Sequence, residues 1–444
     1  MTRLYQMRAP QQQLFSADAK IHTPPATMSG TSWPVKLTGY EFPVHGQGTI
    51  SFTINTDKPF RIVLAENKDF TGKLLVLEVG LNETKLRKDN GTDDAGVLEK
   101  TDNAKALVDK GCDIPYWLSL DYLNKLARFG KGEMLLELVV FNVDINVGDA
   151  KTDPFYYKKL RYIGLAASDD SLLPTVTDHL LWPTPVVLSP PPFLVPNDRL
   201  TLEMIAKNEA TVAAALPDAC QVLYGTVAGP DIKLDTPDFR DFTTAINYSI
   251  ITPGRLCYER LLKKATEFSK KPDPLATYLR VTLGPNMGDS PGSPFVLEIW
   301  PGGHYSPIHD HGEACAVIKV LHGDIWVQLF PELSVKVTDY YTEALFHEGE
   351  VTYLTPQYYQ VHKLINKNQP GNMTATIQCY RYPNDETKHW EFFDYLDGSD
   401  KIKEFTPDSD WDFLTFRDLI RAEWIKEGGI PDPDKPTKDY PVEE

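Results

Sequence analysis

Three histidines in the second half of the chain have side chains and spacing that suit a metal ion. His309 and His311 lie one residue apart in the segment SPIHDH, and side chains two apart in a β-strand share a face. We therefore expect both imidazoles to point the same way, with His362 of the segment VHKLIN as a third ligand from a neighbouring strand. Neutral imidazole binds iron, zinc, copper or nickel, so the residue types alone leave the metal open.

The residues around these histidines follow the spacing of the two cupin motifs, which the chain resembles. The first motif is matched by Gly303, His309, His311 and Gly323, and the second by Gly349, Pro356, His362 and Asn366. In the second motif the histidine comes one place late and the internal glycine is replaced. Cupins usually add a glutamate ligand seven residues before the closing glycine, but Ala316 occupies that position and Glu313 lies too early. We therefore expect a metal that keeps its full double positive charge.

Such a metal centre favours a substrate that binds as an anion. A thiol has a reference pKa of ~8.5, and a thiol bound to a dication loses its proton. Thiolate is a soft ligand that suits a redox-active metal, so we expect oxygen chemistry rather than hydrolysis.

From about residue 278 to residue 382 the chain resembles the cysteine dioxygenases. The likeness is carried by the segment PGGHYSPIHDHGEACAVIKVLHGDIWVQLF and by Trp300 just before it. It implies iron(II) on the three histidines, with a small thiol and O2 as substrates. Tyr278 and Arg280 match the family's Y-x-R element, whose arginine binds the substrate carboxylate through bidentate geometry. The alternative for Arg280 is an ordinary surface charge at a strand end.

The same resemblance implies a tyrosine near the iron, which Tyr380 of TATIQCYRYP matches. Gln378 replaces the family's histidine two residues earlier, on the same strand face. Gln378 can donate a hydrogen bond to the tyrosine oxygen but cannot shuttle protons. Tyr382 is a second candidate for the tyrosine, and His304 is expected at the pocket mouth.

Some members of the family cross-link a cysteine to this tyrosine. The ungapped match puts Ala316 at the cysteine position and Cys315 one place early. A shift of one residue turns a strand side chain to the other face. Either a bulge brings Cys315 to Tyr380, or the cross-link is absent; we expect its absence.

The 444 residues are enough for two domains, and we expect a mainly β chain. Residues 1–32 are expected to form a flexible arm, and 33–168, with many short strands between turns, an antiparallel β-sandwich. The proline-dense stretch 169–200 is expected to be a linker. Residues 201–444 would hold the cupin (double-stranded β-helix) barrel, with helices at 200–216, 255–271 and 412–426 and a C-terminal tail.

The strand pattern over 33–168 resembles the farnesoic-acid-methyltransferase-like domain of invertebrate proteins. It contains no glycine-rich nucleotide loop, so we expect a module for binding or assembly, with an unknown protein or ligand partner.

Composition narrows the partners and the compartment. A formal net charge of -17 argues against nucleic acid or an anionic membrane surface as a partner. The N-terminus lacks a signal-peptide core, and no run approaches the ~20 apolar residues of a membrane span. The five cysteines are scattered without a CxxC pair, which favours the reducing cytoplasm.

Three functions remain open. The first is a thiol dioxygenase acting on L-cysteine, with 3-mercaptopropionate and cysteamine as rival substrates. The second is another three-histidine cupin enzyme, a carbon–carbon dioxygenase or a lyase. The third is a metal-stabilised binding cupin.

Overall fold

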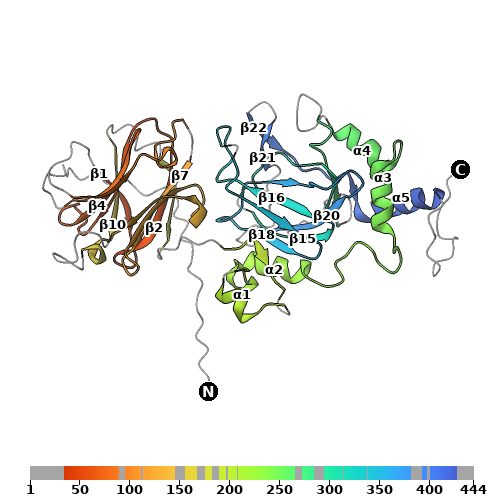
Figure 1. The fold of residues 1–444 in the computed structure, drawn as a ribbon, viewed down its shortest axis with the longest axis horizontal. Coiled ribbons are helices and arrows are strands. Elements are labelled where there is room, and N and C mark those ends of the chain that lie inside the picture. Colours follow the sequence, from red (N-terminus) through yellow and green to blue (C-terminus); the bar gives the residue numbers. More distant parts are fainter. Residues whose placement is uncertain are drawn as a thin grey trace, which may run out of the picture. The chain divides into compact units, whose positions relative to one another are not determined.

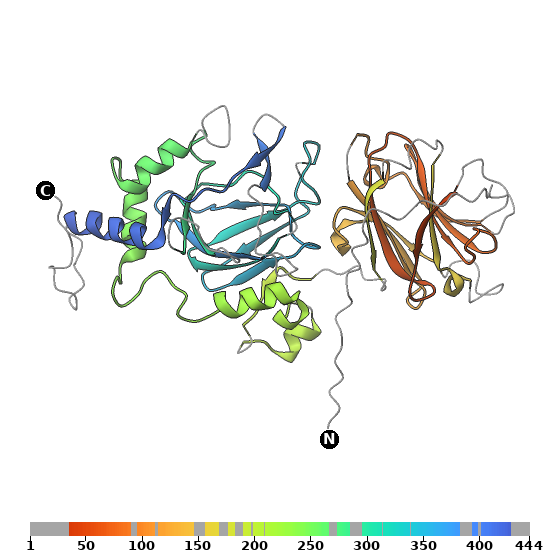
Figure 2. The same cartoon turned by 180° about the vertical axis from the view of Figure 1, so that it is seen from behind.

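The computed structural model divides the chain into two compact units, Met1–Ser189 and Pro190–Glu444 (Figures 1 and 2). It describes residues 35–89, 96–111, 114–145, 156–167, 176–182, 190–196, 199–207, 209–265, 273–284, 295–312, 314–337, 339–381, 393–397 and 401–427. The predicted arm at 1–32 lies outside the described residues, as does the end of the predicted tail.

The first unit is a sandwich of two antiparallel sheets. One sheet has the order β1 (Val35–Glu41), β10 (Tyr162–Ala167), β3 (Phe60–Ala65), β4 (Leu74–Val79), β5 (Thr84–Asp89) and β6 (Val97–Thr101). The other has the order β11 (Val176–Trp182), β2 (Gln47–Ile54), β7 (Ile114–Asp121), β8 (Leu126–Lys131) and β9 (Val139–Asp144). Alternate residues of facing strands meet in one apolar cluster, in which the rings of Phe60 and Tyr116 lie 5.0 Å apart. The predicted antiparallel sandwich is confirmed.

The sandwich continues past residue 168, where a linker was expected to begin. Within the predicted linker, β11 pairs antiparallel with β2, from Val176 opposite Ile54 to Trp182 opposite Thr49. Its sequence, VTDHLLW, is rich in β-formers, and β2 offers the unpaired backbone groups of a sheet edge. The prolines of this stretch led us to predict a linker where the structure has a strand.

The second unit is a barrel of two sheets with a hairpin at the rim. The larger sheet has the order β12 (Phe193–Leu194), β18 (Val351–Leu354), β15 (Cys315–His322), β20 (Thr374–Arg381), β14 (Phe295–Trp300), β13 (Leu279–Thr282) and β23 (Trp411–Asp412). The smaller has the order β17 (Thr342–Phe346), β16 (Ile325–Leu329) and β19 (His362–Ile365), and β21 (Phe393–Asp397) pairs with β22 (Lys401–Phe405). Ile318 of the larger sheet and Val327 of the smaller line the same interior hollow.

Helices pack outside this barrel (Figure 1). They are α1 (Leu202–Ala206), α2 (Asp218–Val227), α3 (Phe242–Ile251), α4 (Leu256–Lys264) and α5 (Phe413–Lys426). The α5 helix confirms the one expected at 412–426, but the helix expected at 200–216 is only α1 and a 3-10 turn, Ala213–Ala215. Other 3-10 turns are Ala104–Ala106, Leu136–Leu138 and Tyr157–Lys159. In the described part of the chain, no helix has the length and apolarity to cross a membrane.

Candidate metal centre

The ligand nitrogens of the three predicted histidines lie within 4.8 Å of one another. His309 and His362 form an antiparallel bridge, in which His309 N–H donates to His362 O at 3.1 Å and His362 N–H donates to His309 O at 3.0 Å. His311 lies in the turn before β15. The imidazoles therefore converge, although residues 309–311 are not inside a continuous strand as expected; the bridge to His362 holds the segment extended instead.

The geometry of the cluster fits a metal ion. The Nε2 atoms of His311 and His362 lie 3.1 Å apart, and two nitrogens bound ~2.1 Å from one ion at right-angled to tetrahedral geometry would lie about 3.0–3.4 Å apart. The Nδ1 atom of His309 faces the carbonyl oxygen of Pro307 at 3.1 Å, and His362 hydrogen-bonds the backbone of Tyr359. A carbonyl partner on one ring nitrogen orients the ring and leaves the other nitrogen free to bind a metal.

Burial keeps these histidines neutral. It lowers the pKa of His309 to about 4, and it lowers the pKa values of His311 and His362 well below the ordinary value. The neighbouring imidazoles and Arg280 add smaller repulsive contributions at His311. Neutral imidazole is the form that binds metals, so the cluster is ready to do so near neutral pH.

A pocket of about 440 Å³, partly open to solvent, adjoins the cluster. Its lining residues are Tyr278, Arg280, Glu298, Trp300, Ser306, Pro307, His309, His311, Leu364, Gln378, Tyr380, Phe393, Tyr395, Phe405 and Pro407. The rings of Tyr278 and Trp300 stack 4.2 Å apart and form one wall. The structure thus brings most of the predicted site residues into one hollow beside the histidines.

His304, expected at the pocket mouth, is not among the residues that line this pocket. Its Nδ1 lies 2.9 Å from the carbonyl oxygen of Thr277. Tyr382, the second candidate for the tyrosine, lies outside the described residues.

Arg280 has a buried partner that the sequence analysis missed. Arg280 of β13 and Glu298 of β14 are directly opposite each other, and Arg280 Nη1 donates to Glu298 Oε1 at 2.6 Å. Burial raises the pKa of Glu298, while Arg280 opposes that rise. The available signal was a single acid within the apolar strand FVLEIW, two residues before Trp300 and so on its face.

Gln378 connects this pair to Tyr380. Gln378 Nε2 donates to Glu298 Oε2 at 2.5 Å, and the Tyr380 hydroxyl donates to Gln378 Oε1. The expectation that Gln378 donates to the tyrosine is therefore wrong: the carboxylate of Glu298 can only accept, so it takes the amide N–H and turns the amide oxygen toward Tyr380. Burial raises the pKa of Tyr380, which keeps its hydroxyl protonated.

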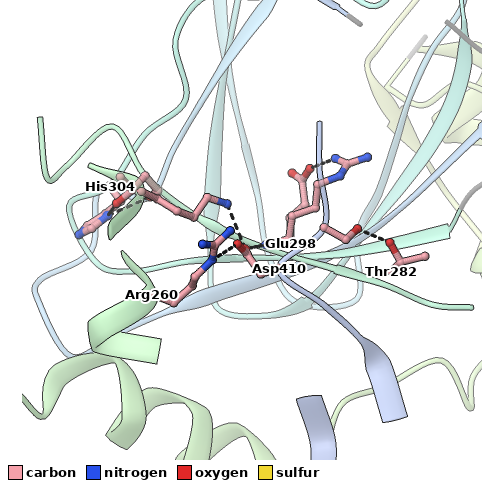
Figure 3. A network of polar contacts seen from close by, with 9 residues as sticks. Arg260, Thr282, Glu298, His304 and Asp410 are labelled. Carbon is pink, nitrogen blue, oxygen red and sulfur yellow. Dashed lines mark hydrogen bonds and ion pairs between the residues drawn. The ribbon is translucent and has the colours of Figure 1, made fainter. Parts of the chain in front are cut away.

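A second buried acid fixes the strand that carries Arg280 (Figure 3). The side chain of Asp410 is fully buried and accepts the backbone N–H of Arg280 at 2.8 Å. It also accepts from Lys264 at 3.0 Å and from Arg260 at 2.5 Å, both on α4. These bonds join α4, β13 and the residue just before β23. They therefore fix the part of β13 that carries Arg280 beside the pocket.

The strand register separates Cys315 from Tyr380. On β15 and β20, Ala316 is opposite Tyr380 and Cys315 is opposite Arg381, and directly opposite residues share a face. The Cys315 thiol instead faces the thiol of Cys220 on α2. The register shift between these strands falls after Val320 and does not alter this pairing.

The chain is similar over part of its length to several solved structures. No protein-family model matches the chain. Oxalate oxidase in complex with the substrate analogue glycolate is 15% identical with a TM-score of 0.20, over 26% of this chain and 55% of that one. A cupin 2 domain-containing protein from Halorhodospira halophila is 18% identical with a TM-score of 0.19, over 28% and 74%. The Cupin_2 domain of an XRE family transcriptional regulator from Enterobacter cloacae is 13% identical with a TM-score of 0.18, over 24% and 98%.

The match spans about half the length of the oxalate oxidase chains, 55% of one and 44% of another. The two facing sheets of the second unit, antiparallel except for the pair β13 and β23, agree with the β-barrel expected for this part of the chain. The barrel holds a cluster of three histidines that could bind a metal ion.

Proposed function

We propose that the protein is an iron(II) thiol dioxygenase that oxidises a small thiol, L-cysteine foremost, to its sulfinic acid with O2. One observation carries the proposal: His309 and His311, which form a three-histidine cluster with His362, line the same pocket as Arg280 and Tyr380. Within the described residues no carboxylate joins the cluster, so a bound dication would keep its charge for an anionic substrate.

Each part of the pocket has a role in this reaction. Iron(II), held by His309, His311 and His362, would supply coordination positions for a thiolate and O2. Arg280 would bind the substrate carboxylate, since a guanidinium fork matches a carboxylate. The Tyr380 hydroxyl, protonated at neutral pH, would donate a hydrogen bond to the reacting oxygen or sulfur by turning its hydrogen away from Gln378 Oε1.

The choice of cysteine follows from the groups that these residues can bind. Its carboxylate suits Arg280, and its amine and thiolate can both reach one metal. 3-Mercaptopropionate keeps the carboxylate and lacks the amine. Cysteamine lacks the carboxylate, so Arg280 counts against it.

The test is O2 uptake by iron-loaded protein with L-cysteine, 3-mercaptopropionate and cysteamine, with the product identified by mass. We expect one O2 consumed per thiol and a product that has gained both oxygen atoms on sulfur. Absence of uptake with every thiol, from protein that retains iron, would favour the binding cupin. Incorporation of oxygen at carbon would favour the other three-histidine enzymes.

A further inference from the structure

Arg280 and Glu298 form a charge pair inside the candidate pocket. Their side chains are 9% and 5% exposed, and both line the hollow that His309 and His311 also line. The positive charge that would attract a substrate carboxylate is thus already balanced by a carboxylate of the protein.

Among the residues that the structure describes, the groups facing Glu298 include no second cation that lacks a carboxylate partner. Arg280 lies opposite it on β13, Gln378 donates to it from β20, and Tyr278 and Tyr380 are neutral phenols. Lys264 of α4 also acts on Glu298 electrostatically, but its ammonium is hydrogen-bonded to Asp410 at 3.0 Å.

A substrate carboxylate that binds Arg280 therefore creates a conflict. Two carboxylates would share one guanidinium in a buried pocket, where an uncompensated charge is unfavourable and one carboxyl group is driven to its protonated form. Burial already raises the pKa of Glu298, so it is the one expected to bind the proton. The same binding event releases a proton, because a thiol that binds a metal dication does so as thiolate.

We propose that Glu298 accepts the proton of the substrate thiol when the substrate carboxylate displaces it from Arg280. The inference rests on the proposed function. In this step the S–H bond breaks and an O–H bond forms on Glu298, while the sulfur keeps the electron pair. The substrate's carboxylate replaces the charge that Glu298 loses, so the balance around Arg280 is unchanged and no proton leaves the protein.

The experiment measures protons exchanged with the buffer when ligands bind to iron-loaded protein without O2. Binding is followed by calorimetry at pH 7 in buffers of different ionisation enthalpy, using 3-mercaptopropionate and propionate, which share the carboxylate. With the wild-type protein we expect 3-mercaptopropionate to release close to no protons and propionate to take up about one. With Glu298→Gln we expect 3-mercaptopropionate to release about one and propionate to exchange none.

A matched control is Glu343→Gln, which removes a carboxylate that pairs with Lys367 and does not line the pocket. It should behave as the wild type. Release of about one proton by 3-mercaptopropionate from the wild type, with no uptake on propionate binding, would overturn the role of Glu298. This comparison needs no variant, so misfolding of Glu298→Gln would leave it decisive. Failure of 3-mercaptopropionate to bind would instead overturn the proposed function and this inference with it.

Discussion

Both units contain two β-sheets that face each other, but the side chains between the sheets differ in kind. In the sandwich the facing strands meet across an apolar cluster that includes Phe52, Phe60 and Phe129. In the barrel the facing sheets enclose histidines, an arginine–glutamate pair and a glutamine. Both are mainly antiparallel β structures, so the difference lies in which side chains the inward-facing positions hold.

That difference locates the chemistry. Burial of polar groups costs free energy unless each finds a partner, and a fold can use apolar residues there at no such cost. In the barrel the partners are built in: Glu298 for Arg280, the amide of Gln378 for Glu298 and Tyr380, and Asp410 for the backbone of Arg280. An interior with such an arrangement is organised for binding rather than for stability alone.

The largest effect is expected from His362→Ala. A three-histidine site has no spare ligand, so we expect loss of bound iron and of all O2 uptake. Metal content by mass spectrometry and an O2 electrode measure both. The control is His347→Ala, since His347 is exposed and interacts with Asp324 outside the cluster. Full iron content in His362→Ala would rule out the assigned ligand set.

The next effect concerns Arg280. A charge-assisted hydrogen bond is worth about 1.5–3 kcal/mol, so Arg280→Ala should raise the KM for cysteine roughly ten- to a hundred-fold, and that for cysteamine far less. The single variant leaves Glu298 buried and unpaired, which should lower the free energy of unfolding of the barrel by about 3–5 kcal/mol.

The double variant Arg280→Ala/Glu298→Gln separates the two effects. It removes both charges, so we expect the free energy of unfolding to return toward the wild-type value while the KM for cysteine stays high. If the free energy of unfolding and the KM for cysteine both returned to wild-type values, Arg280 would act only by stabilising the barrel. Equal changes in KM for cysteine and cysteamine would exclude a contact between Arg280 and the substrate carboxylate.

The metal ligands could be predicted because their spacing is local. His309 and His311 are two residues apart, and the glycine and proline positions of both motifs place His362 on the adjoining strand. Glu298 could not be assigned in the same way. Its role depends on the register that sets it opposite Arg280, eighteen residues away in sequence, and the strand FVLEIW is buried on both faces, so alternation does not show which side chains face the pocket.

Prediction of the fold from the sequence was limited in a similar way. The sandwich strands β2, β3 and β4 follow apolar alternation or β-rich runs and were predicted. The strand β11 was not, because the prolines on either side of Val176–Trp182 suggested a linker, whereas pairing with β2 decided its structure. In both units, the features that could not be predicted from the sequence depend on pairing with residues that are distant along the chain.

A smaller effect should separate Tyr380 from Cys315. Tyr380→Phe removes a hydroxyl beside the pocket and should lower kcat about ten-fold. Cys315→Ser should leave kcat within a few-fold, because that thiol lies on the other face of β15. The intact mass of the wild type should also show no loss of two hydrogens. A thioether-linked peptide joining the two residues after digestion would contradict the observed register.

The smallest effect on turnover, with a large effect on stability, is expected from Phe60→Ala in the sandwich. The ring of Phe60 is buried and lies 5.0 Å from that of Tyr116 and 6.0 Å from that of Phe52. Its loss leaves a cavity and should lower the free energy of unfolding of the sandwich by about 3–5 kcal/mol. Because the barrel has its own core around Leu279 and Phe416, iron content and O2 uptake should be unchanged even under conditions where the variant sandwich unfolds. Chemical unfolding of the full chain, followed alongside O2 uptake, measures both. A fall in turnover that tracks the unfolding of the sandwich would mean that the first unit supports the site in the second, and the contrast between an apolar support and a polar reaction centre would no longer hold.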